Sequence, residues 1–370
     1  MGDIRWAIIH PFQLRVKRGI EVYVWNLARS LKMQGVDVDI LTWAGDLEIP
    51  EEVQEAGVKV KKIPRVRYFQ DYFGIPFLVW WLLTGHYEHV FVHFAGYGEG
   101  LAFLITRLIK RIKFSVVFHF PRSLVPHRYV EFDKWGFGHK AEHLIGVSKA
   151  TAEEVKKWAN RECKAIGHGV DTNKFKPDQN LRIRTRTELG INADVPVLVS
   201  VNALEERKGI QWTVKAIPEL LPKLPGLHFI IVGDGPYRST LEHLVEDLKL
   251  TDQVHFLGSQ NDVRPYLCAG DLNMVLSRGE ASSISLLEGL ACGLPAVTSS
   301  HPPFDELLRQ DWGVCVNEED TSQVVDGVFR LLMDKQALRS MGITGRQMVI
   351  KSHNWDSIAG QYIQLICEVK

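Results

Sequence analysis

Short, continuous apolar runs alternate with longer amphipathic segments along most of the chain. An apolar run is typical of a strand buried on both faces, and a segment with helical periodicity is typical of a helix packed on one side. In the first half, this pattern predicts strands over 4–10, 36–43, 89–94, 114–120 and 143–147, and helices over 20–34, 72–83, 101–110 and 149–159. The second half repeats the alternation, with strands over 195–201, 228–232, 254–257, 272–276, 296–299 and 314–316, and with helices that include 237–248 and 321–333.

Strands that alternate with helices form parallel sheets covered on both faces. The fold class that we predict is therefore α/β, with two doubly wound, Rossmann-like domains that face each other across a cleft. The polar stretch Lys174–Arg186, which contains Pro177, is the predicted linker. We accordingly expect a first domain over 1–175 and a second over 176–354, with a terminal helix over 355–370 that crosses back to the first.

Composition adds modest constraints. Of 370 residues, 45% are hydrophobic and the net charge is zero, as in many globular proteins with large cores. The residues up to Phe175 carry 25 Lys and Arg against 19 Asp and Glu, a balance of +6, and the rest carry −6. A modestly basic first half favours an anionic acceptor or membrane surface, although random variation explains it equally well.

Cysteine usage and the chain's start bear on location. The five cysteines are scattered without a Cys-x-x-Cys spacing, which favours reduced thiols and a cytoplasmic protein. A strand-like run begins at Ile4, so we expect no signal peptide. The longest apolar run, Ile75–Leu83, is too short to span a bilayer.

The most informative pair of residues is Glu280 and Glu288. Glu288 lies within an otherwise apolar helical segment, where a carboxylate is costly without a partner that donates a hydrogen bond. Ser282 or Ser283 can cap the start of that helix, which offers free amides to an anion. Two carboxylates beside an anion site favour a ligand with phosphate and hydroxyl groups, such as a nucleotide sugar.

Three further motifs carry weaker signals. Gly19 follows the first strand and opens a helix, so its backbone can approach a phosphate, although simple turn geometry explains such a glycine more often. His119 ends the strand over 114–120, at the edge where open parallel sheets bind ligands, and packing is an equally good explanation. Asp37 and Asp39 form an Asp-x-Asp pair, which we interpret as a solvated strand face rather than a metal site.

Taken together, the motifs resemble retaining glycosyltransferases of family 4 (glycosyl transferases group 1), which have the GT-B fold. The resemblance covers nearly the whole chain, and its most specific part is Glu280 and Glu288 followed by Ala291-Cys292-Gly293-Leu294-Pro295. Further matches in the same order are Val147-Ser148-Lys149-Ala150-Thr151, Gly167-His168-Gly169-Val170-Asp171, Val232-Gly233-Asp234-Gly235-Pro236 and Phe256-Leu257-Gly258.

The resemblance implies roles for individual residues. Glu288 would hold the ribose diol, and Glu280 would bind hydroxyls of the donor sugar. Lys208 and the amides around Ser282, Ser283 and Ile284 would bind the diphosphate. The loop of Gly258, Ser259 and Gln260 would meet the base, and Gly19 and His119 would face the sugar and acceptor. The candidate catalytic side chains are thus Glu280, Lys208 and His119.

One departure from the family pattern concerns the diphosphate. The family usually carries an Arg a few residues before the Lys, and here Asn202 or Ala203 occupies that position. The loss of a guanidinium removes bidentate phosphate contacts. Arg207, or Arg18 from the first domain, could compensate, and without compensation donor affinity or turnover would be low.

We therefore expect a retaining hexosyltransferase that moves a sugar from a nucleoside diphosphate, with a UDP-hexose such as UDP-glucose favoured, to a glycan or lipid-linked acceptor in polysaccharide biosynthesis. The resemblance implies no metal or other cofactor, and we expect no nucleic-acid partner. The protein would be cytoplasmic. The apolar run Phe77–Leu83 and the basic residues Arg107, Lys110 and Arg111 raise the option of peripheral contact at the inner membrane face, although Trp80 and Trp81 as core residues explain the run slightly better. The alternatives are a nucleotide-sugar epimerase of similar shape and a sugar-nucleotide-binding protein with weak catalysis.

Overall fold

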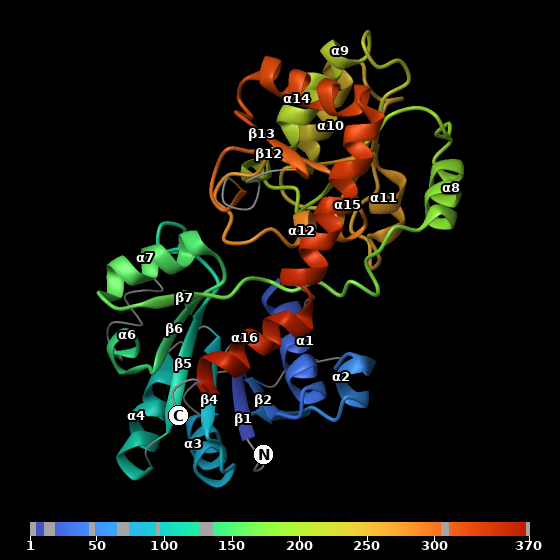
Figure 1. Ribbon diagram of the computed structural model, residues 1–370. Helices are drawn as coiled ribbons and strands as arrows, with labels where there is room; N and C mark the ends of the chain where they lie inside the picture. The colour runs from blue at the N-terminus through green and yellow to red at the C-terminus, as the bar shows by residue number, and fades with distance from the viewer. Residues whose placement is uncertain are drawn as a thin grey trace. The chain divides into compact units, whose positions relative to one another are not determined.

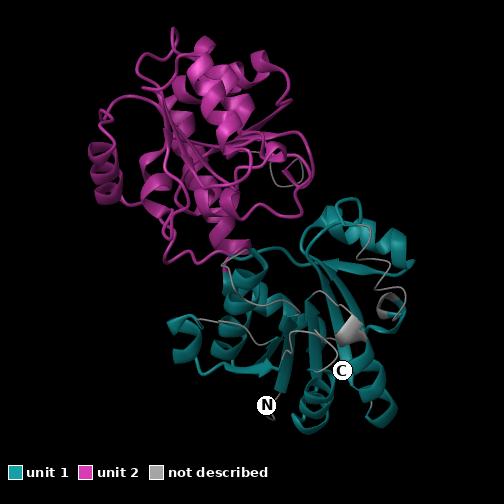
Figure 2. Ribbon diagram, turned by 180° about the vertical axis from the view of Figure 1, so that it is seen from behind, with its two compact units in different colours: residues 1–169, 355–370 teal, residues 170–354 magenta. Residues whose placement is uncertain are grey.

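The computed structural model describes residues 5–10, 19–43, 49–64, 74–93, 97–110, 112–125, 136–304 and 311–367. The chain divides into two compact units (Figures 1 and 2). Unit 1 comprises residues 1–169 and 355–370, and unit 2 comprises residues 170–354. The sequence placed the change of domain after Phe175, a few residues beyond the observed division.

Unit 1 is built on a seven-stranded sheet whose neighbouring strands all run parallel. In sheet order the strands are β3 (Lys59–Ile63), β2 (Asp37–Trp43), β1 (Arg5–His10), β4 (His89–His93), β5 (Lys113–Phe118), β6 (His143–Gly146) and β7 (Cys163–Ala165). Its helices are α1 (Gly19–Met33), α2 (Glu51–Glu55), α3 (Ile75–Thr84), α4 (Tyr97–Ile109), α6 (Phe137–Lys140), α7 (Lys149–Ala159) and α16 (Trp355–Cys367).

Helices cover both faces of this sheet. One face packs against α3, α4 and α7 in a continuous apolar core. On the other face Tyr23 of α1 and Tyr362 of α16 share a hydrogen bond of 2.8 Å between their hydroxyl groups. Phe91 of β4 lies against Tyr362 with ring centroids 5.1 Å apart. The last helix of the chain therefore forms part of unit 1, and it is drawn in red beside α1 in Figure 1.

Unit 2 is built on a six-stranded parallel sheet. In sheet order the strands are β10 (Val254–Phe256), β9 (His228–Val232), β8 (Val197–Val201), β11 (Leu272–Val275), β12 (Ala296–Ser299) and β13 (Gly313–Val316). Its helices are α8 (Gln179–Glu188), α9 (Ile210–Leu220), α10 (Arg238–Asp247), α11 (Arg264–Ala269), α12 (Ile284–Ala291), α14 (Thr321–Met333) and α15 (Lys335–Ser352).

Alternate residues of one strand feed two separate cores in unit 2. Phe229 and Ile231 of β9 point into a core with α9, α10 and α14, whereas Ile230 and Val232 point into a core with α11, α12 and α15. A strand buried on both faces has little room for polar residues. This burial explains why the strands of unit 2 were predictable from apolar runs alone. The α/β class and the two Rossmann-like units are confirmed.

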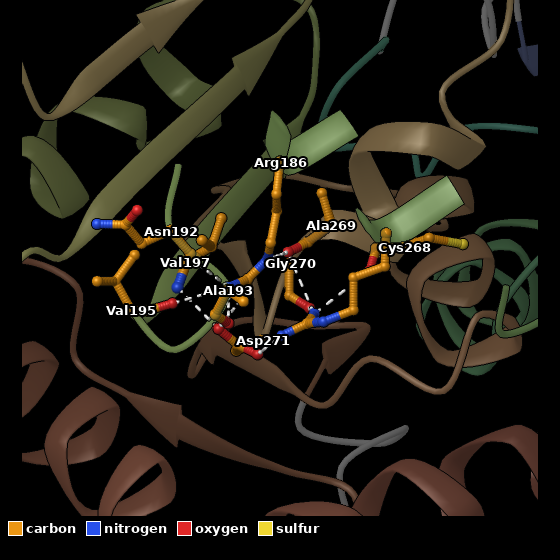
Figure 3. Close-up of polar contacts among 10 residues, drawn as sticks. Arg186, Asn192, Ala193, Val195, Val197, Cys268, Ala269, Gly270 and Asp271 are labelled. Atoms are coloured by element: carbon orange, nitrogen blue, oxygen red, sulfur yellow. Dashed lines mark hydrogen bonds and ion pairs between the residues drawn. The ribbon is translucent and has the colours of Figure 1, made fainter. Parts of the chain in front are cut away.

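Two sequence predictions about local structure were wrong. The stretch 174–186 is not a bare linker, because it contains most of α8, which is fixed to unit 2 by two arginines (Figure 3). Arg182 donates to the carbonyl oxygens of Ala269 and Gly270 at 3.2 and 2.7 Å. Arg186 donates to Asp271 at 2.8 Å and to the Ala193 carbonyl at 2.8 Å. The last carbonyl groups of a helix have no hydrogen-bond donor within the helix, and at the end of α11 the two arginines supply these donors.

The Asp-x-Asp pair on β2 does not form a solvated face. Asp39 is fully buried, and its carboxylate accepts from the Tyr87 hydroxyl at 2.7 Å. The same carboxylate pairs with Arg5 at 3.1 Å and with Lys61 at 2.9 Å. The prediction failed because β2 is an interior strand whose neighbours β1 and β3 supply these cations. These contacts explain Asp39 as a buried structural ion cluster.

Candidate functional site

The candidate site of unit 2 lies where the strand order reverses. Successive strands run outward from β8 toward β10 on one side and from β11 toward β13 on the other. Open parallel sheets bind ligands at the carboxyl ends of the strands beside such a reversal. Lys208 follows β8 and Glu280 follows β11, and these two strands are direct neighbours. The topology therefore brings two residues that are far apart in sequence to one point.

Lys208 and Glu280 form an ion pair at this point. The Lys208 ammonium group donates to Oε1 of Glu280. Both side chains are nearly buried, with 13% and 11% of their surface exposed. Arg207 lies 3.6 Å from the same oxygen and 2.8 Å from Glu205. Two cations and two carboxylates thus share the loop region after β8 and β11.

The backbone of these loops leaves no space for side chains at key glycines. Gly209 has φ +70°, and a Cβ there would lie 2.0 Å from the Leu276 carbonyl oxygen. Gly233 has φ +137°, and its Cβ would lie 1.9 Å from the carbonyl oxygen of Asn202. Only glycine adopts such conformations readily and allows so close an approach. The amide of Arg278 also donates to the Arg207 carbonyl at 2.7 Å, which connects the Lys208 loop to the Glu280 loop.

Helix α12 begins beside this pair. Ser283 is its N-cap, and the Ser283 hydroxyl accepts from the Leu286 amide at 3.3 Å. Ser283 is buried, whereas Ser282 and Ile284 are partly exposed. The first amides of a helix have no carbonyl partner within the helix and favour an anion. The structure thus provides the N-terminal helix end that the sequence predicted next to Glu280.

Glu288, one turn into α12, is a carboxyl group without a partner. Among the described residues it forms no hydrogen bond and no ion pair. Burial raises the pKa of Glu288 to about 8, the charge of Lys174 opposes this shift, and that of Asp262 adds to it. The Glu288 side chain is partly exposed in the free protein, and a carboxyl group withdrawn this far from water without a donor is costly. Glu288 is therefore the described side chain of this helix that most needs a ligand.

The remaining predicted donor residues surround the ends of β8 and β10. Asn202 donates to the Ser200 hydroxyl at 3.1 Å, so its amide is held against the strand. Gly258 has φ +66° and its carbonyl accepts from the Gly233 amide at 2.9 Å. Ser259 and Gln260 are exposed in the same loop, and Gln260 donates to the Leu257 carbonyl at 2.7 Å.

In unit 1, the structure places Gly19 at the first position of α1 and His119 directly after β5. Arg18 lies outside the described residues. His119 is only 4% exposed, and its Nε2 lies 2.9 Å from Nδ1 of His93. Burial, together with the neighbouring histidines His93, His168 and His10, holds the pKa of His119 well below its usual range.

The sequence analysis missed the aromatic cluster around His119. The Tyr23 ring contacts His93, His119 and His168 with centroids 5.6, 5.1 and 4.6 Å away. A signal was present, because His10 and His93 are the last residues of β1 and β4 and His119 follows the neighbouring strand β5. Polar residues at the carboxyl ends of adjacent parallel strands meet at one edge of the sheet.

Comparison with known proteins identifies the family. The model described as glycosyl transferases group 1 matches residues 182–348, and the model described as glycosyltransferase family 4 matches residues 17–174. The chain therefore belongs to the family 4, group 1 glycosyltransferases.

Curated relatives match about half of the chain and about half of their own length. N-acetyl-alpha-D-glucosaminyl L-malate synthase of Bacillus anthracis is 29% identical over 212 residues, which are 57% of this chain and 55% of that protein. A GDP-mannose-dependent alpha-(1-6)-phosphatidylinositol monomannoside mannosyltransferase of Mycobacterium tuberculosis is 31% identical over 205 residues, 52% of each protein.

Solved structures match the whole chain. Anabaena HepE in complex with UDP and glucose superposes with a TM-score of 0.81 at 18% identity, over 99% of this chain and 100% of that one. Sucrose-phosphate synthase from Thermosynechococcus elongatus superposes with a TM-score of 0.78 at 20% identity, over 99% of both chains. These likenesses show that the fold is GT-B, as predicted.

Proposed function

We propose that this protein transfers a hexose from a nucleoside diphosphate sugar to a glycan or lipid-linked acceptor, with retention of the anomeric configuration. The observation that carries the proposal is the joint placement of the Lys208–Glu280 pair, the start of α12 and the unpartnered Glu288 at the reversal of strand order. These groups match the parts of one ligand: cations and amides for the diphosphate, and carboxylates for sugar and ribose hydroxyls.

In this proposal Lys208 and the α12 amides stabilise the departing diphosphate. Charge develops on the diphosphate as the glycosidic bond breaks, and preorganised donors aimed at developing charge lower the barrier. In the free protein the Lys208 ammonium group donates a hydrogen bond to the Glu280 carboxylate. A bound diphosphate would compete for the ammonium group, which leaves Glu280 to accept hydrogen bonds from the donor sugar. No covalent nucleophile is invoked, and the leaving phosphate takes the acceptor proton on the same face.

Arg207 is the proposed replacement for the missing family arginine. Its guanidinium lies 3.6 Å from the oxygen of Glu280 that Lys208 contacts, and it is about half exposed. Of the two residues that can occupy the usual arginine position, Asn202 donates a hydrogen bond to the Ser200 hydroxyl and Ala203 has no polar side chain. A guanidinium can bind a phosphate in a bidentate manner that an asparagine cannot. If Arg207 does not bind the diphosphate, the second candidate function applies, which is that of a sugar-nucleotide-binding protein with weak catalysis.

UDP-glucose is the first donor to test and GDP-mannose the second. The neighbour HepE was solved with UDP and glucose, whereas the mycobacterial relative is named GDP-mannose-dependent. A thermal-shift panel should contain UDP, GDP, UDP-glucose, UDP-N-acetylglucosamine and GDP-mannose. A ligand at about 100 times its dissociation constant stabilises the folded state by about 2.7 kcal/mol. Stabilisation by none of these nucleotides would contradict the proposed donor class.

We also propose that transfer needs no bound metal. The support is that Asp39, the buried member of the Asp-x-Asp pair, is already bound by Arg5, Lys61 and Tyr87. The test is transfer in the presence of a chelator, with magnesium or manganese added back in parallel. Activity that is lost with the chelator and restored by the metal would refute this part of the proposal.

A further inference from the structure

Exposed apolar side chains of unit 1 gather on two neighbouring helices, α3 and α4, which lie side by side in Figure 1. Among the described residues of the whole chain, eleven large hydrophobic side chains are exposed, and five of these belong to this pair of helices. They are Phe77 at 39%, Trp80 at 59%, Leu104 at 43%, Leu108 at 83% and Ile109 at 67% exposure. Scattered exposed apolar residues are ordinary, but a contiguous set indicates an interaction site.

The outer stripe of α3 contains no charged residue. The helix reads Ile-Pro-Phe-Leu-Val-Trp-Trp-Leu-Leu-Thr, and Leu78 and Leu82 bury its inner face in the core. Phe77, Trp80 and Thr84 lie on the exposed side. A surface helix of a globular protein normally carries charged residues there. Trp81 packs partly against the core, so only the first of the two adjacent tryptophans projects outward.

Basic residues border this apolar surface. Arg107 is exposed on α4 between Leu104 and Leu108, and Lys110 follows the helix. The Arg107 guanidinium reaches the Lys140 carbonyl at 3.5 Å, which places the end of α6, with exposed His139 and Lys140, next to the end of α4. The nearby acidic residue Glu142 is paired with Lys113 at 3.1 Å. The border of the apolar patch at the ends of α4 and α6 is therefore cationic.

We propose that the outer faces of α3 and α4, with the basic residues at the ends of α4 and α6, form a surface that binds an anionic lipid bilayer. Trp80, Leu108 and Ile109 enter the interface between headgroups and acyl chains, where tryptophan is favoured. Arg107, Lys110 and Lys140 contact anionic headgroups. This is binding to one leaflet, since among the described residues no helix is long and apolar enough to cross a membrane. The proposal does not depend on the nucleotide site of unit 2.

The combination of charge and apolar surface favours a bilayer over a second protein. A protein interface of this type would be expected to present an apolar centre matched by a specific partner, whereas a bilayer needs only apolar insertion and a positive border. Removal of one basic residue near the surface should weaken binding to anionic vesicles about fivefold. Removal of Trp80 and Leu108, the most exposed apolar side chain of each helix, should weaken it at least about tenfold.

The test is co-sedimentation of the full chain with vesicles of phosphatidylcholine alone or mixed with phosphatidylglycerol. Wild type should sediment with the anionic vesicles at low salt, less so as salt rises, and little with neutral vesicles. The variant with Trp80→Ser and Leu108→Ser should lose most binding, and the variant with Arg107→Gln and Lys140→Gln should bind more weakly and with a smaller salt dependence than wild type. The matched control carries Met333→Ser and Ile343→Ser, which remove exposed apolar side chains of unit 2 at 60% and 54% exposure.

Circular dichroism and thermal unfolding must show that each variant is folded. The control variant should bind vesicles as wild type does. Wild-type protein that stays in the supernatant with anionic vesicles at low salt overturns the proposal, and so does binding that the α3–α4 variant leaves unchanged. Sedimentation velocity tests whether a second copy of the chain covers this surface instead. A wild-type dimer that dissociates in the variant with Trp80→Ser and Leu108→Ser, with no vesicle binding, would overturn the bilayer proposal and assign the surface to dimerisation.

Discussion

Lys208 and Glu280 are bound to each other although they follow different strands and lie 72 positions apart in the sequence. Their strands, β8 and β11, are adjacent only because the sheet of unit 2 reverses its order there. Neither residue is at the surface as a freely solvated ion, so the pair holds a cation and a carboxylate in fixed positions. We regard this pair as the centre of the proposed donor site.

Replacement of Lys208 by Ala should lower the rate of transfer by about 100- to 1,000-fold, since it removes one preorganised charge partner of the leaving diphosphate. The thermal stability should fall by less than the rate, because Arg207, 3.6 Å from the same Glu280 oxygen, remains as a cationic partner. Lys215→Ala is the matched control, because Lys215 is an exposed lysine of the same unit that lies over the Trp212 ring. Turnover of Lys208→Ala close to that of wild type would remove Lys208 from the mechanism.

Glu288 should make nucleotide affinity depend on pH. The free protein holds this carboxyl with a pKa of about 8, so it is largely protonated at pH 7. Ribose hydroxyls donate to the ionised form, so binding should release protons, and affinity should rise with pH until about 8 and then level off. Calorimetry between pH 7 and 9, in buffers with different ionisation enthalpies, measures both effects.

Glu288→Gln is the matched variant for this measurement. It should bind the nucleotide at least about tenfold more weakly above pH 8, since a hydrogen bond to a charged group contributes about 1.5–3 kcal/mol. It should also abolish the proton release. Affinity that is independent of pH in wild type, or a folded Gln variant with undiminished affinity, would argue against the ribose role.

The buried histidines of unit 1 should make the fold sensitive to acid. Burial, with smaller effects of His143 and Lys113, lowers the pKa of His89 to about 3. Burial also holds the pKa values of His93 and His119 well below their usual range. The unfolded chain binds these protons near pH 6.5, so each such histidine should cost up to about 1.4 kcal/mol of stability per pH unit below that point.

Urea unfolding at pH 7.5, 6.5 and 5.5 measures this dependence. His89→Gln keeps a side chain that can bond to the Ser115 hydroxyl, which contacts His89 at 2.8 Å, and it does not titrate. The variant should therefore lose less stability than wild type between pH 6.5 and 5.5. Wild-type stability that stays constant or increases as the pH falls to 5.5 would contradict the buried, neutral state of these histidines.

Arg186 should be the more important arginine of α8 for stability. It is 3% exposed and donates to Asp271 and to the carbonyl groups of Ala269, Ala193 and Val195. Arg186→Met should cost about 3 kcal/mol, because several carbonyl groups lose their donor and the partly buried Asp271 keeps only Arg182 as a cationic partner. Arg184→Met is the control, since Arg184 forms an exposed pair with Glu188, and exposed pairs of this kind contribute little to stability. Equal losses in the two variants, measured by urea unfolding, would refute this account.

Burial decided which elements were predictable from the sequence. The interior strands β9 and β12 were predicted with the observed bounds, since both are buried on both faces and each contains an apolar core. The edge strands β3 and β7 were missed. β3 reads Lys-Val-Lys-Lys-Ile and β7 has three residues, so neither has the pattern of a buried strand. Edge strands commonly carry lysine and are short, and apolar patterning does not detect strands of this kind, whereas it did detect the more apolar edge strands β10 and β13 of unit 2.

The candidate site was predictable where one short segment contains it. The Ser283 cap, the α12 helix and Glu288 follow one another in the chain, and local rules suffice for them. The pairing of Lys208 with Glu280 depends on the order of strands, and the contact of His119 with His93 depends on the neighbouring positions of β4 and β5. The environment of Asp39 also depends on the order of strands, because the cations that pair with it, Arg5 and Lys61, come from the neighbouring strands. These contacts cannot be predicted from the spacing of residues in the sequence alone.

The most direct test of the central claim follows the anomer that the protein releases from its donor. The full chain is incubated with UDP-glucose or GDP-mannose, in which the sugar is α-linked, and water serves as a slow acceptor when no other is present. Proton NMR at early times, before mutarotation, should show the α-anomer of the free sugar together with the nucleoside diphosphate, and Lys208→Ala should abolish the release. Early release of the β-anomer, or binding of the nucleotide sugars with no release from any donor or to any acceptor, would contradict a retaining glycosyltransferase.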